Sequence, residues 1–300
     1  MDERTVRLGA LLRYKQRSQP REARGRAVVE LLCGADIDPS AAEPIERQKT
    51  RAQLLNLEEL RNDIGQDPKA SRKLFEAVIE KDDTLPRRFL FQGEAAARPV
   101  GRIVIRMSAS NIRYGTGSLV SRHLLLTNNH VIDSEDTGIR GFLELGYYEL
   151  APNMLPAEHQ TFQIRPDKFF YTSEDLDYTL VGVENDNGYA TTAAYGQVDL
   201  LSASGKALIG ERVNIVQHSG GRPQVISIRE NTTADVFDQW VHYTADTEPG
   251  SSGAAVFNDE WQLVALHHAS VPTGRDAAGS LVNEGVRVSA IVDDLKRALS

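Results

Sequence analysis

The sequence predicts a mainly β domain preceded by a small all-α module, and three observations lead to this prediction. Up to Leu85–Pro86, apolar residues recur at helical spacing. After that point their period changes to two, and nine short strand-like runs follow, punctuated by Gly, Pro, Asn and Asp. A last run, SAIVDDLKRAL, returns to helical spacing. We therefore expect a helical module at 1–85 and a β-barrel or sandwich at 86–300 that closes with a helix.

The helical module should contain four helices. Their apolar runs include Val6 to Leu12, Val28 to Leu32 before Gly34, Ile45 to Leu60, and Leu74 to Ile79. Asp67 and Pro68 suit the start of the fourth helix, as an N-cap followed by a first-turn proline. No chemistry-bearing cluster lies in this part. We expect residues 1–85 to form a regulatory or adaptor module that recruits a protein partner or restrains the β domain.

Composition excludes several classes of function. The chain has 300 residues, of which 41% are hydrophobic and 25% charged, as in a globular protein, and no apolar run is long enough to span a membrane. Residues 1–85 are electrically balanced, so residues 86–300 carry the whole net charge of −8 and should repel nucleic acid. The single cysteine, Cys33, permits no internal disulfide, and no signal peptide is evident. A cytoplasmic location is expected.

A histidine, an aspartate and a serine stand beside strand-like runs in the second part. His130 follows the apolar run LLLT in LLLTNNHVID, where its imidazole could act as a general base. Asp177 directly precedes the run YTLV, where a carboxylate needs a partner such as the imidazole N–H of His130. Asp175 is the rival for this role, and Asp177 is preferred because it abuts the apolar run. Each residue alone could equally be a turn residue.

The third segment, DTEPGSSGAAVFN, contains the tight turn Gly250–Gly253. Such a turn can expose the hydroxyl of Ser252 and aim backbone N–H groups at one point, as an oxyanion hole requires. The order histidine, aspartate, serine differs from that of α/β-hydrolases, which also want Gly-x-Ser-x-Gly, whereas position 254 is alanine. Order, motif and helix placement therefore exclude that class.

The three segments resemble those of chymotrypsin-fold (trypsin-like) serine peptidases. GTGSLVSRHLLLTNNHV resembles the histidine segment, LDYTLVGVE the aspartate segment and EPGSSGAAVFN the Gly-x-Ser-Gly nucleophile segment. The resemblance covers roughly residues 98–298 and implies two six-stranded β-barrels with a C-terminal helix. It also implies that His130 is the base, Asp177 its orienter and Ser252 the nucleophile, with the N–H groups of Gly250 and Ser252 as the oxyanion hole.

The resemblance is greatest to glutamyl endopeptidases and their intracellular bacterial relatives. In that branch an apolar residue followed by histidine lies on the strand after the nucleophile, and a threonine lies five residues before the nucleophile. The corresponding residues here are His267 and Thr247, which the resemblance places in the specificity pocket. Cleavage after glutamate is thus implied, although Glu248 could repel an acidic side chain. The competing interpretation of His267 is a core histidine.

The sequence therefore predicts a serine endopeptidase that acts on protein or peptide substrates without a cofactor or metal. The alternative is a catalytically silent peptidase fold that serves as a binding or scaffold module. A heat-shock chaperone-protease is disfavoured, since no substrate-binding domain follows the peptidase in this sequence. A nucleic-acid or membrane partner is not expected.

Overall fold

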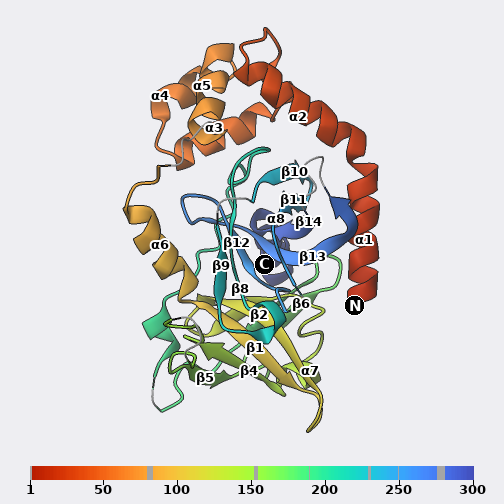
Figure 1. Cartoon of the computed structure of the whole chain (residues 1–300), viewed down its shortest axis with the longest axis vertical. Coiled ribbons are helices and arrows are strands. Elements are labelled where there is room, and N and C mark those ends of the chain that lie inside the picture. Colours follow the sequence, from red (N-terminus) through yellow and green to blue (C-terminus); the bar gives the residue numbers. More distant parts are fainter. Residues whose placement is uncertain are drawn as a thin grey trace.

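The computed structural model describes residues 2–79, 84–151, 155–188, 190–228, 231–248, 250–275 and 281–300. Helices lead the chain and close it, and two antiparallel sheets lie between them (Figure 1). The helices are α1 (Glu3–Gln16), α2 (Ser18–Leu32), α3 (Ile45–Leu54), α4 (Glu58–Asp63), α5 (Pro68–Ile79), α6 (Arg88–Ala97), α7 (Glu135–Gly138) and α8 (Val288–Leu299), with 3₁₀ turns η1 (Pro39–Ala41), η2 (Thr192–Tyr195) and η3 (Ser219–Gly221). None of the described helices is both long enough and apolar enough to cross a membrane.

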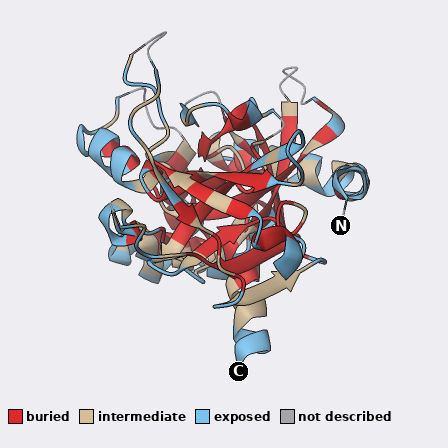
Figure 2. Cartoon of the chain, turned by 90° about the horizontal axis from the view of Figure 1, so that it is seen from below, coloured by how far each residue is buried: buried red, intermediate tan, exposed pale blue. Residues whose placement is uncertain are grey.

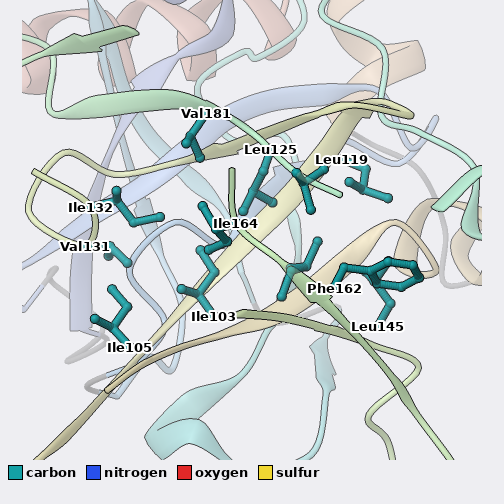
Figure 3. Packing of buried hydrophobic residues seen from close by; sticks show 12 residues of the cluster. Ile103, Ile105, Leu119, Leu125, Val131, Ile132, Leu145, Phe162, Ile164 and Val181 are labelled. Atoms are coloured by element: carbon teal, nitrogen blue, oxygen red, sulfur yellow. The ribbon is translucent and has the colours of Figure 1, made fainter. Parts of the chain in front are cut away.

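The first sheet has the strand order β5-β4-β1-β2-β3-β7-β6. Its strands are β1 (Val100–Arg106), β2 (Ile112–Ser121), β3 (Leu124–Thr127), β4 (Gly141–Leu145), β5 (Gln160–Gln163), β6 (Phe170–Ser173) and β7 (Tyr178–Gly182). Alternate side chains of these strands meet inside the curled sheet, where Ile103, Leu125 and Phe162 belong to one buried cluster (Figure 3). Packing in this cluster holds β3 and β7 in place through Leu125 and Val181, and the candidate site lies at the ends of these two strands.

The second sheet has the order β10-β11-β14-β13-β12-β8-β9. Its strands are β8 (Asn214–Gln217), β9 (Val225–Ser227), β10 (Thr233–Phe237), β11 (Trp240–Thr244), β12 (Ala255–Phe257), β13 (Leu263–Arg275) and β14 (Leu281–Arg287). Two curled antiparallel sheets followed by a C-terminal helix confirm the predicted chymotrypsin-like fold. The resemblance implied six strands per barrel, whereas hydrogen bonds join seven in each sheet over the described residues. Both sheets are largely buried and the helices outside them are more exposed (Figure 2).

Two helix predictions need correction. The run from Ile45 to Leu60 is not one helix, because the chain leaves α3 at Leu54 and Asn56 adopts a left-handed φ of 57° before α4 begins. Asparagine tolerates this conformation better than most residues. The segment after Pro86, expected to open the β domain, instead forms α6. Phe89, Gly93 and Ala97 recur on one face of α6, which packs against Trp261, and a Cβ at Gly93 would press into that indole.

The N-terminal helices do not form one bundle. Helices α2, α3 and α5 share a core around Leu74 and Phe75, to which Leu208 of the β part also belongs. Helix α1 instead lies along β13 (Figure 1), and its buried Val6 and Ala10 pack in a separate cluster with residues of β13 and β14. The independence of residues 1–85 as a module stays a prediction.

Candidate active site

His130 lies in the turn that follows β3. The backbone N–H groups of Val131 and Ile132 both donate to the carbonyl oxygen of Asn128, which closes the turn. Val131 and Ile132 are buried in the core of the first sheet, so the backbone on one side of the histidine is fixed. The His130 side chain is 7% exposed. A short polar turn anchored by two apolar residues thus holds the imidazole at the end of a strand.

Asp177 lies at the entrance to β7, which pairs with β3 in antiparallel register, Thr127 opposite Thr179. Its carboxylate is buried and accepts two hydrogen bonds from His130. The backbone N–H of His130 donates to Oδ1 at 2.9 Å, and Nδ1 of the imidazole lies 2.7 Å from Oδ2. The rival Asp175 is exposed. The structure therefore brings His130 together with Asp177, as predicted.

Asp177 has a second imidazole partner, which sequence reasoning missed. Nδ1 of His268 lies 2.7 Å from Oδ2, the same oxygen that contacts His130. Burial alone would raise the pKa of Asp177, but the hydrogen bonds from His130 and His268 outweigh it and hold this pKa well below its ordinary value. The carboxylate is therefore ionised at neutral pH. With a carboxylate as acceptor at Nδ1, the proton of a neutral His130 belongs on Nδ1, leaving Nε2 as an acceptor.

Ser252 lies in the turn that precedes β12, and β2 of the first sheet holds this turn. The N–H of Thr116 donates to the carbonyl oxygen of Ser252 at 2.8 Å, and the Thr116 hydroxyl donates to the carbonyl of Gly250 at 2.9 Å. Gly253 has a φ of 84°, and a Cβ there would collide with the carbonyl oxygen of Thr116. Glycine is required at that position because of both its backbone conformation and this close approach.

His130 and Ser252 line one cavity of about 490 Å³ between the two sheets. Gly250 contributes to its wall, and so do Asp2 and Glu3 at the start of α1. Nε2 of His130 is buried, and no hydrogen-bond partner for it occurs among the described residues. An acceptor nitrogen without a partner in a cavity shared with a serine is suited to receiving that serine's proton.

The turn also leaves backbone donors available. The N–H groups of Ser251, Gly253 and Ala254 donate to backbone carbonyls. Within the described residues, no backbone acceptor is recorded for the N–H of Gly250 or of Ser252. Gly250 has a φ of 98°, and a Cβ there would lie 2.9 Å from the N of Gly220. These are the two N–H groups predicted for the oxyanion hole, and that role stays a prediction.

The residues predicted for the specificity pocket have separate partners. The Thr247 hydroxyl donates to Oδ1 of Asn283 at 2.7 Å and lies 3.0 Å from Oγ of Ser270. His267 is buried, and its Nδ1 lies 2.6 Å from the hydroxyl of Tyr243. Among the described contacts, no hydrogen bond joins Thr247 to His267. A bound carboxylate would have to bridge them.

Burial sets the charge state of His267. Burial, together with the neighbouring His268 and His130, lowers the pKa of this imidazole to about 3. His267 is therefore neutral at neutral pH. Burial and the charge of Glu284 raise the pKa of Tyr243 well above its ordinary value, so its hydroxyl keeps its proton and donates to Nδ1. Nε2 of His267 then carries the imidazole proton and is a donor.

Two further buried groups join the site through His268. Nε2 of His268 lies 3.4 Å from the carboxylate of Glu284, which also contacts Nε2 of His242 at 2.9 Å. Strand alternation gave no usable signal for His268, because the register of β13 shifts between His267 and Ala269. No three His, Cys, Asp or Glu side chains gather as metal ligands within the described ranges.

Fold and site together define a trypsin-like peptidase domain. The chain belongs to this family, whose sequence pattern matches residues 115–266. The matched span contains all of the histidine, aspartate and serine segments described above.

Similar proteins include a curated relative and solved structures. The uncharacterized protein y4fB of Sinorhizobium fredii is 33% identical over 265 residues, which cover 76% of this chain and 40% of that protein. The chain thus spans about two fifths of that relative's length. The active form of the Rv3671c protease from M. tuberculosis has a TM-score of 0.49 and 15% identity, over 73% of this chain and 93% of that one. An inactive mutant form of Rv3671c has a TM-score of 0.48 and 14% identity, over 74% and 99%.

Proposed function

We propose that this protein is a serine endopeptidase in which His130, Asp177 and Ser252 form the catalytic triad. The observation on which the proposal rests is the buried His130–Asp177 pair, because His130 shares a cavity with Ser252 and its Nε2 has no hydrogen-bond partner among the described residues. The family match supports a peptidase, and the contact of His130 with Asp177 supports their proposed roles as base and orienter.

The proposed reaction is acyl transfer followed by hydrolysis. Ser252 Oγ attacks the carbonyl carbon of the scissile peptide bond while His130 Nε2 takes the hydroxyl proton. The N–H groups of Gly250 and Ser252 stabilise the resulting oxyanion, and the Asp177 carboxylate stabilises the imidazolium. His130 then gives its proton to the leaving amine, and the C–N bond breaks. Water, activated by the same imidazole, hydrolyses the ester and restores Ser252.

We further propose that the substrate carries glutamate before the cleaved bond. A neutral His267 that donates from Nε2, together with the Thr247 hydroxyl, is suitable for hydrogen bonding to a carboxylate. Glu248, whose charge could oppose such a substrate, forms an exposed ion pair with Arg222. The pair offsets the charge of Glu248 at the edge of the site.

The helical part is proposed to bind a regulatory protein partner. Leu8 and Leu12, four residues apart in α1, are 51% and 59% exposed, and Val29 of α2 is 59% exposed. Exposed large apolar side chains are candidates for contact with a partner. A cytoplasmic location is part of the same proposal and agrees with the lone, exposed thiol of Cys33.

The test is cleavage of a peptide library varied at the residue before the cleaved bond, with Ser252→Ala as control. We expect cleavage after glutamate that is abolished in S252A and weakened at least about tenfold in Thr247→Val, because the pocket would then lose a hydroxyl donor. Cleavage after another residue would retain the triad and refute the Thr247–His267 pocket. A fluorophosphonate probe separates the alternatives further, since a silent scaffold would not be labelled at Ser252.

A further inference from the structure

Helix α1 borders the cavity of the candidate active site at Glu3, and its Arg13 contacts the buried polar groups behind that site. Val6 and Ala10 of this helix are buried against Ala269, Val271 and Val282, which sets the position of α1 along β13 and β14. From there the Arg13 guanidinium extends to Glu284, with Nη2 at 2.5 Å from Oε1 and Nε at 3.0 Å from Oε2. The guanidinium also stacks 3.9 Å from the ring centre of Trp240. The packing, the bidentate contact and the stacking all orient this side chain.

Glu284 connects Arg13 to the residues of the proposed triad. Its side chain is fully buried, and His268 lies between it and Asp177. Arg13 Nη2 also lies 3.3 Å from Nε2 of His268. A continuous path of polar contacts thus runs from Arg13 through Glu284, His268 and Asp177 to His130. It joins the N-terminal helix to the proposed general base.

The charges along this path depend on one another. Asp177 and Glu284 are both buried carboxylates, and burial of a carboxylate is costly unless a cation or hydrogen-bond donors compensate it. Burial alone would lower the pKa of His268, but hydrogen bonds to Asp177 and Glu284 raise it. Arg13 is the guanidinium that pairs with Glu284 among the described residues. Without it, Glu284 would draw the His268 imidazole toward itself, and Asp177 would lose one of its two imidazole donors.

We propose that Arg13 is a positioning residue of the active site, which by neutralising Glu284 keeps His268 hydrogen-bonded to Asp177 and thereby keeps Asp177 aligned with His130. This inference rests on the proposed function. Helix α1 is then an integral part of the peptidase site and not only of a regulatory module. The proposed relay acts on the alignment of the reacting groups and does not require contact with the substrate.

The chain offers a matched control in Arg17, one turn further along. Arg17 also pairs with a fully buried carboxylate, that of Asp235, at 3.0 Å. It also stacks over an aromatic ring, 4.9 Å from the ring centre of Phe237. No described contact links Asp235 to Asp177. Loss of Arg17 therefore weakens the docking of the same helix in a similar way but leaves the relay to Asp177 intact.

The experiment compares Arg13→Ala, Arg13→Lys and Arg17→Ala in the full chain, with kcat, KM and the rate of fluorophosphonate labelling as readouts. We expect R13A to lower kcat and the labelling rate by about tenfold to 100-fold with little change in KM, as misplacement of reacting groups does. R13K should recover part of the loss, and R17A should stay within about twofold of the wild type, since it leaves the aligned groups in place. Equal losses in R13A and R17A, or no loss in R13A, would overturn the proposal.

A spectroscopic readout keeps the two proposals separate. The Nδ1 protons of His130 and His268, both hydrogen-bonded to Asp177, should give low-field proton NMR signals, assigned with His130→Gln and His268→Gln. If the wild type is not labelled at Ser252, the proposed function fails, and these signals still decide about Arg13. A shifted or lost His268 signal in R13A, with both signals unchanged in R17A, supports the positioning role. Unchanged signals in R13A refute it.

Discussion

At the residue scale, the site depends on a single carboxylate oxygen that serves two imidazoles. Oδ2 of Asp177 lies 2.7 Å from Nδ1 of both His130 and His268, while Oδ1 accepts the backbone N–H of His130. All three contacts require an acceptor-only group. An ionised aspartate provides this, and the lowered pKa of Asp177 keeps it ionised across the physiological range.

Substitution of Asp177 by asparagine should therefore abolish most activity without unfolding the protein. An amide nitrogen at one of the two oxygen positions would face an N–H donor, and His130 would be driven to the wrong tautomer. We expect a loss of kcat on the order of 10⁴-fold, as for amidation of the aspartate in other such triads. Cleavage of the best library peptide measures it. Asp175→Asn, at an exposed position two residues away, should retain nearly full activity, and a comparable loss there would contradict the assignment.

The residues of the candidate triad could be predicted because each lies in a short segment with its own local signal. An apolar run ends before His130 and another begins after Asp177, and these runs become the paired strands β3 and β7. His268 gave no such signal. A second histidine in an apolar strand looks like a packed side chain, and only the three-dimensional pairing of β13 with its neighbours reveals that it faces Asp177.

At the element scale, a buried ion-pair cluster fastens α3 to the β part. Arg51 of α3 is almost fully buried and contacts Glu43 at 2.9 Å and Glu211 at 3.1 Å. Its guanidinium also donates to the carbonyl of Ala207. Burial alone would lower the pKa of Arg51, but the two carboxylates raise it, so the guanidinium stays charged. One cation thus bridges carboxylates on both sides of the contact, and Arg47 also pairs with Glu43.

Replacement of Arg51 by methionine should destabilise the protein strongly. It would remove the cation that bridges the buried carboxylates of Glu43 and Glu211, while Arg47 still pairs with Glu43, and breaking a buried pair costs about 3–5 kcal/mol. Urea unfolding measures the change. Arg61→Met serves as control, because the Arg61–Glu58 pair has side chains 41% and 58% exposed and should contribute at most about 1 kcal/mol. Similar effects of the two substitutions would refute this account.

Element boundaries were predictable only in part. The apolar run Val28–Leu32 near the end of α2 follows from spacing, and the start of α5 follows from Asp67–Pro68. The break at Asn56 and the presence of α6 did not follow. The break depends on the left-handed conformation of Asn56, which tertiary packing determines. Helix α6 depends on the contact of Phe89 and Gly93 with Trp261, which lies far along the chain. Local propensity does not encode such long-range contacts.

At the scale of the whole molecule, buried ionisable groups tie folding to pH. Burial lowers the pKa of His218 from 6.5 to about 4 and that of His267 to about 3. Below pH 6.5 these two histidines are protonated in the unfolded chain, whereas in the folded protein they stay neutral until the pH reaches their lowered pKa values. The free energy of unfolding therefore falls as the pH decreases. Glu284 and Asp177, whose pKa values are held low, extend this loss to more acidic pH. His268, whose pKa is raised, has the opposite effect and contributes stability at low pH.

We therefore expect the free energy of unfolding to decrease from pH 7 to pH 4. Each buried neutral histidine contributes at most about 1.4 kcal/mol per pH unit to this slope. His218→Gln removes one such group outside the proposed triad, so its stability should decrease less over the same interval. Urea midpoints at each pH give the comparison. Parallel curves for the wild type and the variant would show that His218 does not titrate as its burial implies.

The stacking of Arg13 on Trp240 also gives the molecule an optical reporter. The sequence contains two tryptophans, and the other, Trp261, packs against Phe89 and donates its indole N–H to the Phe89 carbonyl, away from α1. In a Trp261→Phe background, fluorescence would arise from Trp240 alone. Detachment of α1 would uncover that indole and shift its emission to longer wavelength. Because Trp240 stacks on the Arg13 guanidinium that pairs with Glu284, its emission would report movement of the N-terminal helix in real time during turnover.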